Sequence, residues 1–179
     1  MKRLHFIVSL VLASLLVIPT LVAAQAKAPT AVITLEKGGD ITVELFPADA
    51  PKTVESFVKL ARGGFYDGTT FHRVIPGFVA QAGDPLSKTL PAGDPRLGTG
   101  GPGFQLKAEF NKQKHDRGVL AMARGRDPDS AGSQFYITLG PAPHLDGQYT
   151  VFGRVTSGMN VVDSIKLNDR IKTIKIAGP

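Results

Sequence analysis

The sequence has no cysteine, no tryptophan and only three tyrosines. Without cysteine the chain cannot form disulfides, thiolate metal sites, iron–sulfur clusters or a cysteine nucleophile. Phenylalanine, with ten copies, is therefore the main large side chain available for a core. The length of 179 residues suffices for one globular domain or two very small ones. With 42% hydrophobic residues, the chain is too polar for a multi-span membrane protein and too apolar for a disordered one.

Acidic residues are fewer than basic ones, 15 against 21, which gives a formal net charge of +6. The basic residues are interspersed with acidic ones, and neither sign forms a long run. This pattern favours a solvated, mixed surface over a patch for nucleic acid or for an anionic membrane. We therefore expect no nucleic-acid partner.

The first 26 residues differ in composition from the rest. Two basic residues precede an apolar run over residues 6–18, and a stretch of small residues follows. A basic start, a short apolar centre and an A-x-A-like end are typical of a secretory signal peptide, here cleaved after Ala24 or Ala26. The alternative is an uncleaved membrane anchor, but the run is shorter than the roughly 20 residues of a spanning helix.

Cleavage would leave a mature domain over residues 27–179. We expect it to be exported across the inner membrane, and to reside in the periplasm if the host is Gram-negative. After cleavage we expect no stable membrane association.

Strand patterns dominate the mature chain. Runs rich in β-branched and aromatic residues predict strands over residues 31–35, 41–46, 70–75, 78–82, 118–123, 133–138, 149–155 and 173–176. Apolar spacing predicts helices over residues 52–62 and 160–166. Residues 83–104 form a long glycine-rich loop by this pattern, and no linker divides the chain into two domains. Because helices and strands do not alternate regularly, the sequence predicts a mainly-β domain, for which a closed antiparallel barrel leaves no open edge.

Several polar residues stand inside or beside the apolar strands, where buried polar groups need partners. They are His72, Arg73, Gln81, Arg124, Gln134 and His144. Strand alternation places Arg73 on the same face as Phe71 and Ile75. The simpler interpretation of Arg73 is a side chain whose stem lies on apolar surface while its head reaches water.

Familiar catalytic motifs are missing. The glycines of residues 98–103 neither follow a strand nor open a helix, as a dinucleotide fingerprint requires. No two histidines are four residues apart, which excludes a zinc-binding helix of that type. Ser133 lacks the second glycine of a nucleophile elbow, so a hydrolase is the weakest hypothesis.

Four sequence blocks indicate the fold and the function more specifically than the composition does. They read FHRVIPGFVAQAGD at 71–84, GSQFYI at 132–137, LDG at 145–147 and VFG at 151–153, with APKT at 50–53 opening the first helix. In order and spacing these blocks resemble the cyclophilins, a family of peptidyl-prolyl cis-trans isomerases. The resemblance covers about residues 30–177, essentially the whole mature chain.

The resemblance implies a closed eight-stranded antiparallel β-barrel capped by two α-helices, with an active groove on its outside. It implies that Arg73 is the catalytic arginine and that His72 and Gln81 are its neighbours in the groove. Substrate-binding positions by the same resemblance are Phe78, Val79, Tyr136 and Leu145 in the proline pocket, Ala123, Arg124 and Gly125 along the substrate backbone, Gln134 as a polar contact, and His144 and Tyr149 at the rim. We expect His115 at the surface or in a turn, outside the site.

Three positions depart from the best-known eukaryotic members of that family. His144 stands where they have a tryptophan that binds cyclosporin, Tyr149 where they have a histidine, and Val79 where they have a methionine. Bacterial members are similar in lacking the tryptophan. We therefore expect weak cyclosporin binding.

The expected function is catalysis of X–Pro rotation in exported proteins, on unfolded or partly folded polypeptides that contain proline. The chemistry needs no cofactor and no metal, and we expect a monomer. A module that binds proline-containing segments without turnover is the alternative from another class.

Overall fold

The computed structural model describes residues 28–178. The expected signal peptide, residues 1–26, lies outside the described residues. The strands are β1 (Thr30–Leu35), β2 (Asp40–Leu45), β3 (Arg73–Ile75), β4 (Val79–Ala82), β5 (Val119–Met122), β6 (Phe135–Thr138), β7 (Val151–Ser157) and β8 (Ile171–Ala177). The α-helices are α1 (Pro51–Arg62) and α2 (Met159–Asp163), and short 3-10 helices cover Pro85–Lys88, Pro128–Ser130 and Pro143–Leu145. Over residues 28–178, no helix is both long and apolar enough to cross a membrane.

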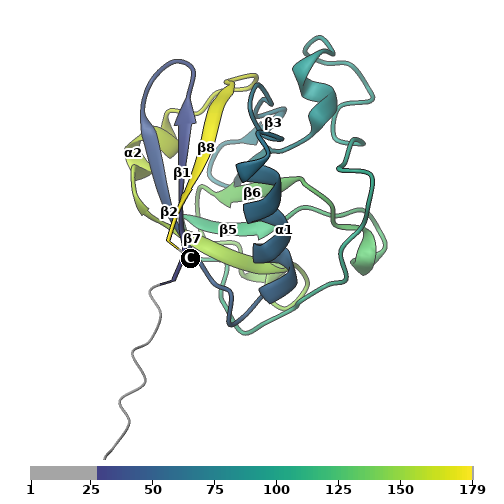
Figure 1. Cartoon of the computed structure of the whole chain (residues 1–179), viewed down its shortest axis with the longest axis vertical. Coiled ribbons are helices and arrows are strands. Elements are labelled where there is room, and N and C mark those ends of the chain that lie inside the picture. Colours follow the sequence, from purple (N-terminus) through teal and green to yellow (C-terminus); the bar gives the residue numbers. More distant parts are fainter. Residues whose placement is uncertain (1–27, 179) are drawn as a thin grey trace, which may run out of the picture.

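The eight strands form one antiparallel sheet in the order β3-β4-β6-β5-β7-β2-β1-β8 (Figure 1). The expectation of a closed barrel is wrong, because the end strands β3 and β8 do not pair with each other. Backbone contacts at or just before the start of these two strands link the two ends: an isolated bridge joins Thr70 to Arg170, and the amide of Ile171 donates to the carbonyl of Thr69 at 2.8 Å. Residues 70–72 leave the strand conformation expected for them, so β3 is too short to complete the ring. The sheet is therefore an open, curled half-barrel.

Helix α1 crosses the open side of the curled sheet and packs against β8 (Figure 1). Pro51 begins the helix, where its missing N–H costs nothing. The carboxylate of Glu109, far along the chain, accepts hydrogen bonds from the amides of Lys52 and Thr53 at 3.0 and 2.8 Å. It thereby satisfies two N–H groups that a helix start leaves unpaired. The helix carries Phe57 into the core.

Phenylalanine fills the core, as the composition predicts. Phe57, Phe71, Phe135 and Phe152 are among the largest fully buried side chains. The ring of Phe57 meets that of Phe135 edge to face, with the centroids 5.7 Å apart, a favoured aromatic geometry. This interior cluster holds α1 on the concave face of the sheet.

A second apolar cluster covers the opposite face of the sheet around β4, β5 and β6. Its buried members are Val79, Val119, Ala121, Tyr136 and Val151. Strands β5 and β6 are consequently buried at every position. This outer cluster forms a second apolar layer on the outside of the sheet, and solvent can reach this layer from one side.

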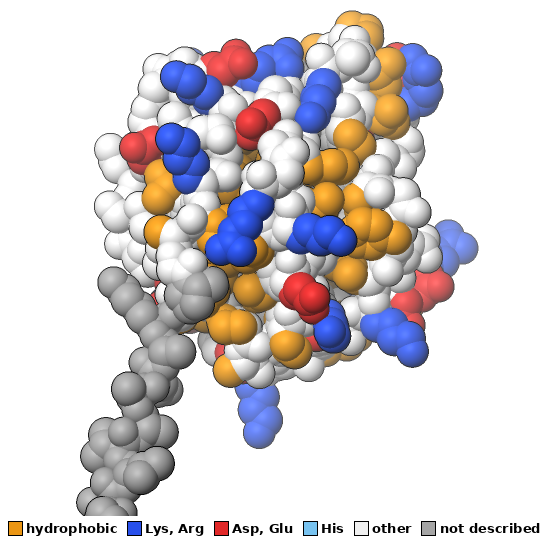
Figure 2. Space-filling model, in the orientation of Figure 1, with side chains coloured by type: hydrophobic (Ala, Val, Ile, Leu, Met, Phe, Trp, Pro, Cys, Tyr) orange, Lys and Arg blue, Asp and Glu red, His pale blue; other side chains and the backbone are white. Residues whose placement is uncertain are grey.

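Charged side chains are spread over the surface. On the face shown in Figure 2, lysine and arginine side chains lie between acidic and apolar ones and do not gather into one patch. The mixed charge pattern of the sequence is therefore also a mixed pattern in space on this face.

Candidate functional site

Strand register lines up four side chains across the outer face of the sheet. Arg73 pairs with Gln81 in the β3–β4 hairpin, Gln81 pairs with Tyr136 on β6, and Tyr136 pairs with Ala121 on β5. Paired residues of antiparallel strands point to the same face. The turn at Pro76-Gly77 makes this row possible, because Gly77 adopts a φ of +71° that L side chains rarely accept.

The prediction that Phe71 lies on the same face as Arg73 and Ile75 is wrong. Its side chain is fully buried in the interior core, whereas Arg73 and Ile75 are exposed on the outside. The alternation fails because the strand begins only at Arg73. Arg73 thus lies at the rim of the outer apolar cluster and not among core residues.

A cavity of about 300 Å³ opens on this outer face. It is lined by Arg73, Phe78, Val79, Gln81, Ala123, Arg124, Tyr136, Leu145 and Tyr149. All nine are among the site residues expected from the sequence. The guanidinium of Arg73 lies 6.0 Å from the ring centroid of Phe78. The arrangement offers an apolar recess, walled by Phe78, Val79, Tyr136 and Leu145, with the permanent positive charges of Arg73 and Arg124 at its edge.

A second, larger cavity of about 820 Å³ adjoins the first and shares Gln81, Ala123 and Arg124 with it. The end of the glycine-rich loop, residues 98–104, and Gln105 form one side, and Gly125 and Gln134 also line it. Because they share Gln81, Ala123 and Arg124, the two cavities together form one groove that includes the apolar recess.

A chain of side-chain amides connects Arg73 to this loop. Nη1 of Arg73 donates to Oε1 of Gln81 at 3.3 Å, and Nε2 of Gln81 donates to Oε1 of Gln134 at 2.9 Å. Nε2 of Gln134 then donates to the carbonyls of Gly98 and Gly100 at 2.9 and 2.8 Å. Because the last two acceptors are carbonyls, both amides are fixed in one direction, with oxygen toward Arg73.

Asp84 holds the glycine-rich loop in the position in which its carbonyls accept the hydrogen bonds from Gln134. Its side chain is fully buried, and its carboxylate accepts hydrogen bonds from the backbone amides of Leu86 and Gly98 at 2.8 and 2.5 Å. A buried carboxylate needs such partners to offset its desolvation. Asp84 therefore ties the start of the long loop to its end.

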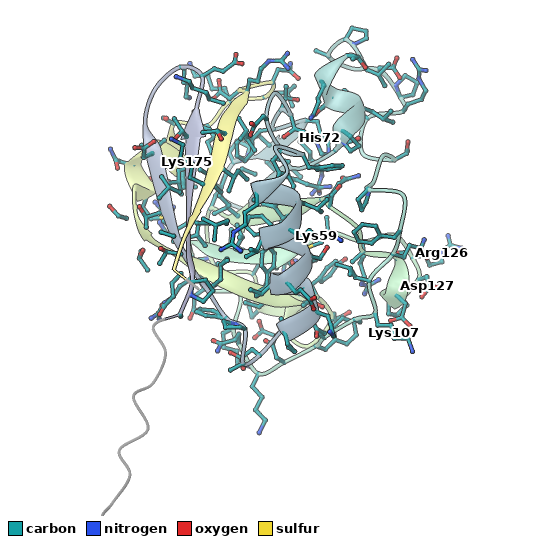
Figure 3. The ribbon with its side chains drawn as sticks, viewed as in Figure 1. Lys59, His72, Lys107, Arg126, Asp127 and Lys175 are labelled. Carbon is teal, nitrogen blue, oxygen red and sulfur yellow. The ribbon has the colours of Figure 1, made fainter. Side chains whose placement is uncertain are left out.

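Arg124 joins two loops beside the recess. Its guanidinium donates to the carbonyl of Gln148 at 3.2 and 3.0 Å and to the carbonyls of Gly125 and Arg126 at 3.0 and 3.3 Å. It also lies over the ring of Tyr149, 4.6 Å from its centroid. Arg126 and Asp127, next along this loop, lie at the outer edge of the molecule (Figure 3).

Two expected residues line neither cavity. His144 stacks on Phe78 with ring centroids 5.4 Å apart, so it flanks the recess from outside. His72 lies near β3 (Figure 3), and neither of its ring nitrogens has a hydrogen-bond partner among the described residues. Burial lowers the pKa of His72, although the carboxylate of Asp84 acts in the opposite direction. A neutral imidazole in that position does not contribute charge to the groove.

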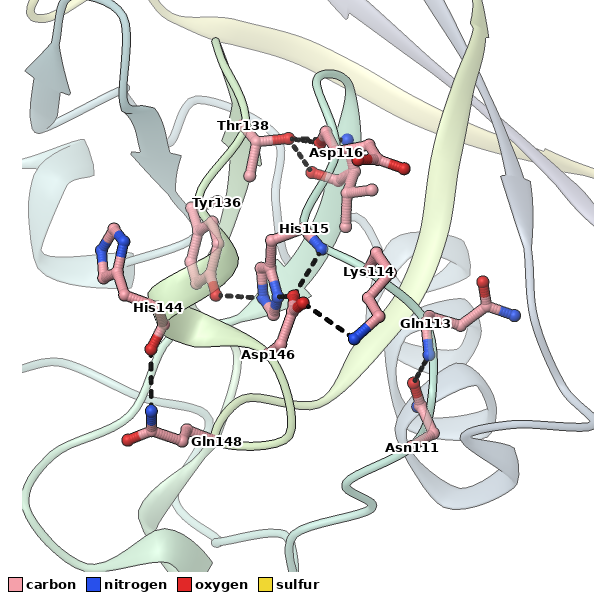
Figure 4. Close-up of polar contacts among 11 residues, drawn as sticks. Asn111, Gln113, Lys114, His115, Asp116, Tyr136, Thr138, His144, Asp146 and Gln148 are labelled. Carbon is pink, nitrogen blue, oxygen red and sulfur yellow. Dashed lines mark hydrogen bonds and ion pairs between the residues drawn. The ribbon is translucent and has the colours of Figure 1, made fainter.

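The expectation that His115 lies at the surface or in a turn outside the site is wrong in its first part. Its side chain is 0% exposed and lies directly behind Tyr136, between that ring and Asp146 (Figure 4). Nε2 of His115 is 3.0 Å from the hydroxyl of Tyr136. The signal available in the sequence was weak: a histidine and a tyrosine, each bound for an apolar interior and each needing a polar partner.

Within residues 28–178, no three histidine, aspartate or glutamate side chains gather in a way that would hold a metal ion. The groove residues offer hydrogen-bond donors and acceptors, the permanent charges of Arg73 and Arg124, and apolar surface.

Comparisons with known proteins agree on one family. The model for "Cyclophilin type peptidyl-prolyl cis-trans isomerase/CLD" matches residues 30–177. The peptidyl-prolyl cis-trans isomerase B of Bacillus subtilis is 46% identical over 151 residues, covering 83% of this chain and 99% of that protein. The peptidyl-prolyl cis-trans isomerase of Helicobacter pylori is 48% identical over 154 residues, covering 83% and 87%. A crystal structure of a cyclophilin-type isomerase from Cryptosporidium parvum, obtained in the presence of the dipeptide Ala-Pro, superposes with a TM-score of 0.70 at 32% identity, covering 84% and 99%.

Proposed function

This chain belongs to the cyclophilin-type peptidyl-prolyl cis-trans isomerases, and on that premise we propose how its groove accelerates rotation about X–Pro bonds and where it does so. The single observation that carries the mechanism is the placement of Arg73 at the edge of an apolar recess of about 300 Å³. The substrate we propose is a polypeptide segment containing proline. Its proline ring occupies the recess, and the chain on either side lies along the groove.

The barrier to X–Pro rotation arises because twisting the bond breaks the amide resonance. Trans is preferred by only about 0.5–1 kcal/mol, but the barrier is about 18–20 kcal/mol. When the bond twists, the imide nitrogen loses conjugation, becomes pyramidal and carries a lone pair. A donor aimed at that lone pair is bound more strongly in the twisted state than in either planar state, which is the condition for catalysis.

Arg73 is suited to be that donor. An arginine stays protonated at every relevant pH, so the reaction needs no proton transfer. Its hydrogen bond to Gln81 engages Nη1 and holds the guanidinium beside the recess. A charge-assisted hydrogen bond contributes roughly 1.5–3 kcal/mol, whereas a thousandfold acceleration needs about 4 kcal/mol.

The apolar recess supplies the remainder. Phe78, Val79, Tyr136 and Leu145 hold the proline ring while the carbonyl side of the bond rotates. They also exclude water, which stabilises the planar, more polar amide. In this account Gln81 positions Arg73, and His72 is a structural neighbour.

The cellular setting we propose is protein folding outside the inner membrane. The supporting observation is the basic, apolar and small-residue pattern of residues 1–26, which is typical of a secretory signal peptide. Expression of the full chain in a Gram-negative host, followed by fractionation and N-terminal sequencing, tests this. A periplasmic product starting at Gln25 or Lys27 is expected; a product that keeps residues 1–26 and stays with the membrane would contradict export.

A coupled isomerisation assay on a chromogenic tetrapeptide with an Ala–Pro bond tests the catalytic proposal. The wild-type protein should accelerate rotation, and Arg73→Ala should lose most of that acceleration. Tight peptide binding without acceleration would instead favour a binding module.

A further inference from the structure

The tyrosine wall of the apolar recess is held from behind by a buried histidine. Nε2 of His115 lies 3.0 Å from the hydroxyl of Tyr136, and the two rings stack at 20° with centroids 6.1 Å apart. On the other side, Nδ1 of His115 lies 3.1 Å from Oδ1 of Asp146. Figure 4 shows the three side chains in this order, with His144 on the far side of Tyr136 and outside the chain of contacts.

Asp146 is itself well fixed. Its Oδ1 accepts a hydrogen bond from the backbone amide of His115 at 2.8 Å, and its Oδ2 lies 3.2 Å from Nζ of Lys114. The hydrogen bond from the His115 amide is the main reason that the pKa of Asp146 falls to about 2. The carboxylate is therefore ionised at neutral pH and can only accept hydrogen bonds.

This fixes the direction of the whole chain of hydrogen bonds. Since Asp146 only accepts, Nδ1 of His115 must carry the ring proton, and in a neutral imidazole Nε2 is then an acceptor. The hydroxyl of Tyr136 must therefore donate to Nε2. Burial favours the neutral forms of both partners, because it lowers the pKa of His115 and raises the pKa of Tyr136.

We propose that His115, oriented by Asp146, is a positioning residue of this isomerase: it fixes the ring of Tyr136 as a wall of the proline recess and keeps the tyrosine hydroxyl turned away from the substrate. The inference rests on the proposed function, because it takes this recess as the binding place of the proline ring. His115 itself does not line the recess and acts through Tyr136.

The Tyr136 hydroxyl needs such a partner because it is a polar group in the wall of an apolar recess. If the hydroxyl lost its partner, it would either stay buried and unpaired or rotate toward the recess, and both outcomes weaken the binding of an apolar ring. The wall contacts planar and twisted substrate alike. Its loss should therefore raise KM more than it lowers kcat.

Three variants test this arrangement. His115→Leu removes the acceptor and should raise KM about tenfold, the usual order for a buried hydroxyl left unpaired. The double variant His115→Leu/Tyr136→Phe removes both partners and should return KM to within about threefold of wild type, because no polar atom is then orphaned. His115→Gln keeps an acceptor for the hydroxyl and should bind substrate much as wild type does.

Thr69→Val is the matched control. Thr69 is fully buried and donates one hydroxyl hydrogen bond, to the carbonyl of Tyr66 at 2.7 Å, outside both cavities. It should lose stability without a change in KM. An equal KM in His115→Leu and Thr69→Val would show that His115 is only structural and would overturn the inference.

The pH profile supplies a second readout. Protonation of His115 places a donor against the Tyr136 hydroxyl, so wild-type kcat/KM should fall in acid. Because burial lowers the pKa of His115, this fall should lie below the unperturbed value of about 6.5. Titratable or charged groups facing these hydrogen-bonded side chains are Asp146, Lys114, Tyr136, Tyr149, His144 and Arg124. His115→Gln should flatten this acid limb while His144→Gln retains it; an unchanged limb in His115→Gln would contradict the proposal.

Nitrogen NMR of the histidine rings separates this inference from the proposed function. At pH 7 the proton of His115 should reside on Nδ1, with Nε2 bare, whether or not the protein accelerates rotation. A proton on Nε2 would overturn the inference and leave the isomerase mechanism standing. Conversely, an active Arg73→Ala variant beside a raised KM in His115→Leu would refute the role of Arg73 and keep that of His115.

Discussion

The side-chain oxygen of Gln81 faces the guanidinium of Arg73 at 3.3 Å. This orientation is imposed from the other end of the amide, because Nε2 of Gln81 donates to Gln134 at 2.9 Å. Gln134 in turn has no freedom to flip, since its own Nε2 donates to two loop carbonyls. The glycine-rich loop thus determines which atom Gln81 presents to Arg73.

Gln81→Leu should therefore lower kcat about tenfold, because a hydrogen bond to a charged group contributes roughly 1.5–3 kcal/mol and this one is long and exposed. KM should change little, since the apolar walls are intact. Gln113→Leu is the control: its amide donates to Asp49 at 2.8 Å, outside both cavities. Equal kcat values for the two variants in the tetrapeptide assay would contradict a positioning role for Gln81.

Stability should decrease in acid because two histidines are held neutral. Burial lowers the pKa of both His72 and His115, so the unfolded chain binds protons more readily than the folded one. Their contribution is complete above about pH 6.5 and is lost as the pH falls, with a slope of at most about 1.4 kcal/mol per pH unit for each site. Urea unfolding between pH 8 and pH 5 measures this.

The variant His72→Gln provides the test of that assignment. It should flatten part of the pH dependence of unfolding free energy, since it removes one of the two titrating groups. A wild-type unfolding free energy that does not change between pH 8 and pH 5 would show that neither imidazole is held neutral.

Cyclosporin binding should be weak and should respond to position 144. His144 stacks on Phe78 at the outer side of the recess, where a tryptophan would add apolar area and an indole N–H donor. His144→Trp should tighten cyclosporin binding about tenfold, the order expected for one added aromatic contact with a hydrogen bond. Isothermal titration of both proteins measures the change, and equal affinities would contradict it.

Gly83 should tolerate no side chain at the end of β4. Its φ is +88°, and a Cβ there would lie 2.4 Å from the carbonyl oxygen of Ser133. Gly83→Ala should destabilise the fold by about 3 kcal/mol or more, the left-handed strain of about 1–2 kcal/mol plus the clash. Gly93→Ala isolates the strain, because Gly93 has a φ of +83° with nothing within 4 Å. Chemical unfolding that ranks the two variants equally would contradict this account.

Local sequence patterns predicted most of the elements, because turn residues and periodicity are local properties. Eight strands and both α-helices were expected, with α1 within one residue of its observed start. Closure was not predictable in the same way. Whether β3 meets β8 depends on tertiary packing: residues 70–72 lie outside β3, and Phe71 among them is buried in the interior core.

The residues of the groove were predictable only through the family resemblance. The buried contacts that hold those residues in place were not predictable from the sequence. Arg73 and Gln81 are eight residues apart in one hairpin, so their pairing follows from the turn. His115 meets Tyr136 and Asp146 across 21 and 31 residues. Sequence periodicity does not indicate such a pairing, which is why this buried histidine was expected at the surface or in a turn.

The most direct test of the account is the catalytic efficiency of Arg73→Ala, measured beside Arg62→Ala. Arg62, at the end of α1, lies outside both cavities of the groove, so its variant should keep wild-type kcat/KM. Arg73→Ala should lose at least about tenfold, because a charge-assisted hydrogen bond contributes roughly 1.5–3 kcal/mol to the twisted state. If folded Arg73→Ala isomerises the Ala–Pro tetrapeptide as fast as wild type, the proposed mechanism is wrong.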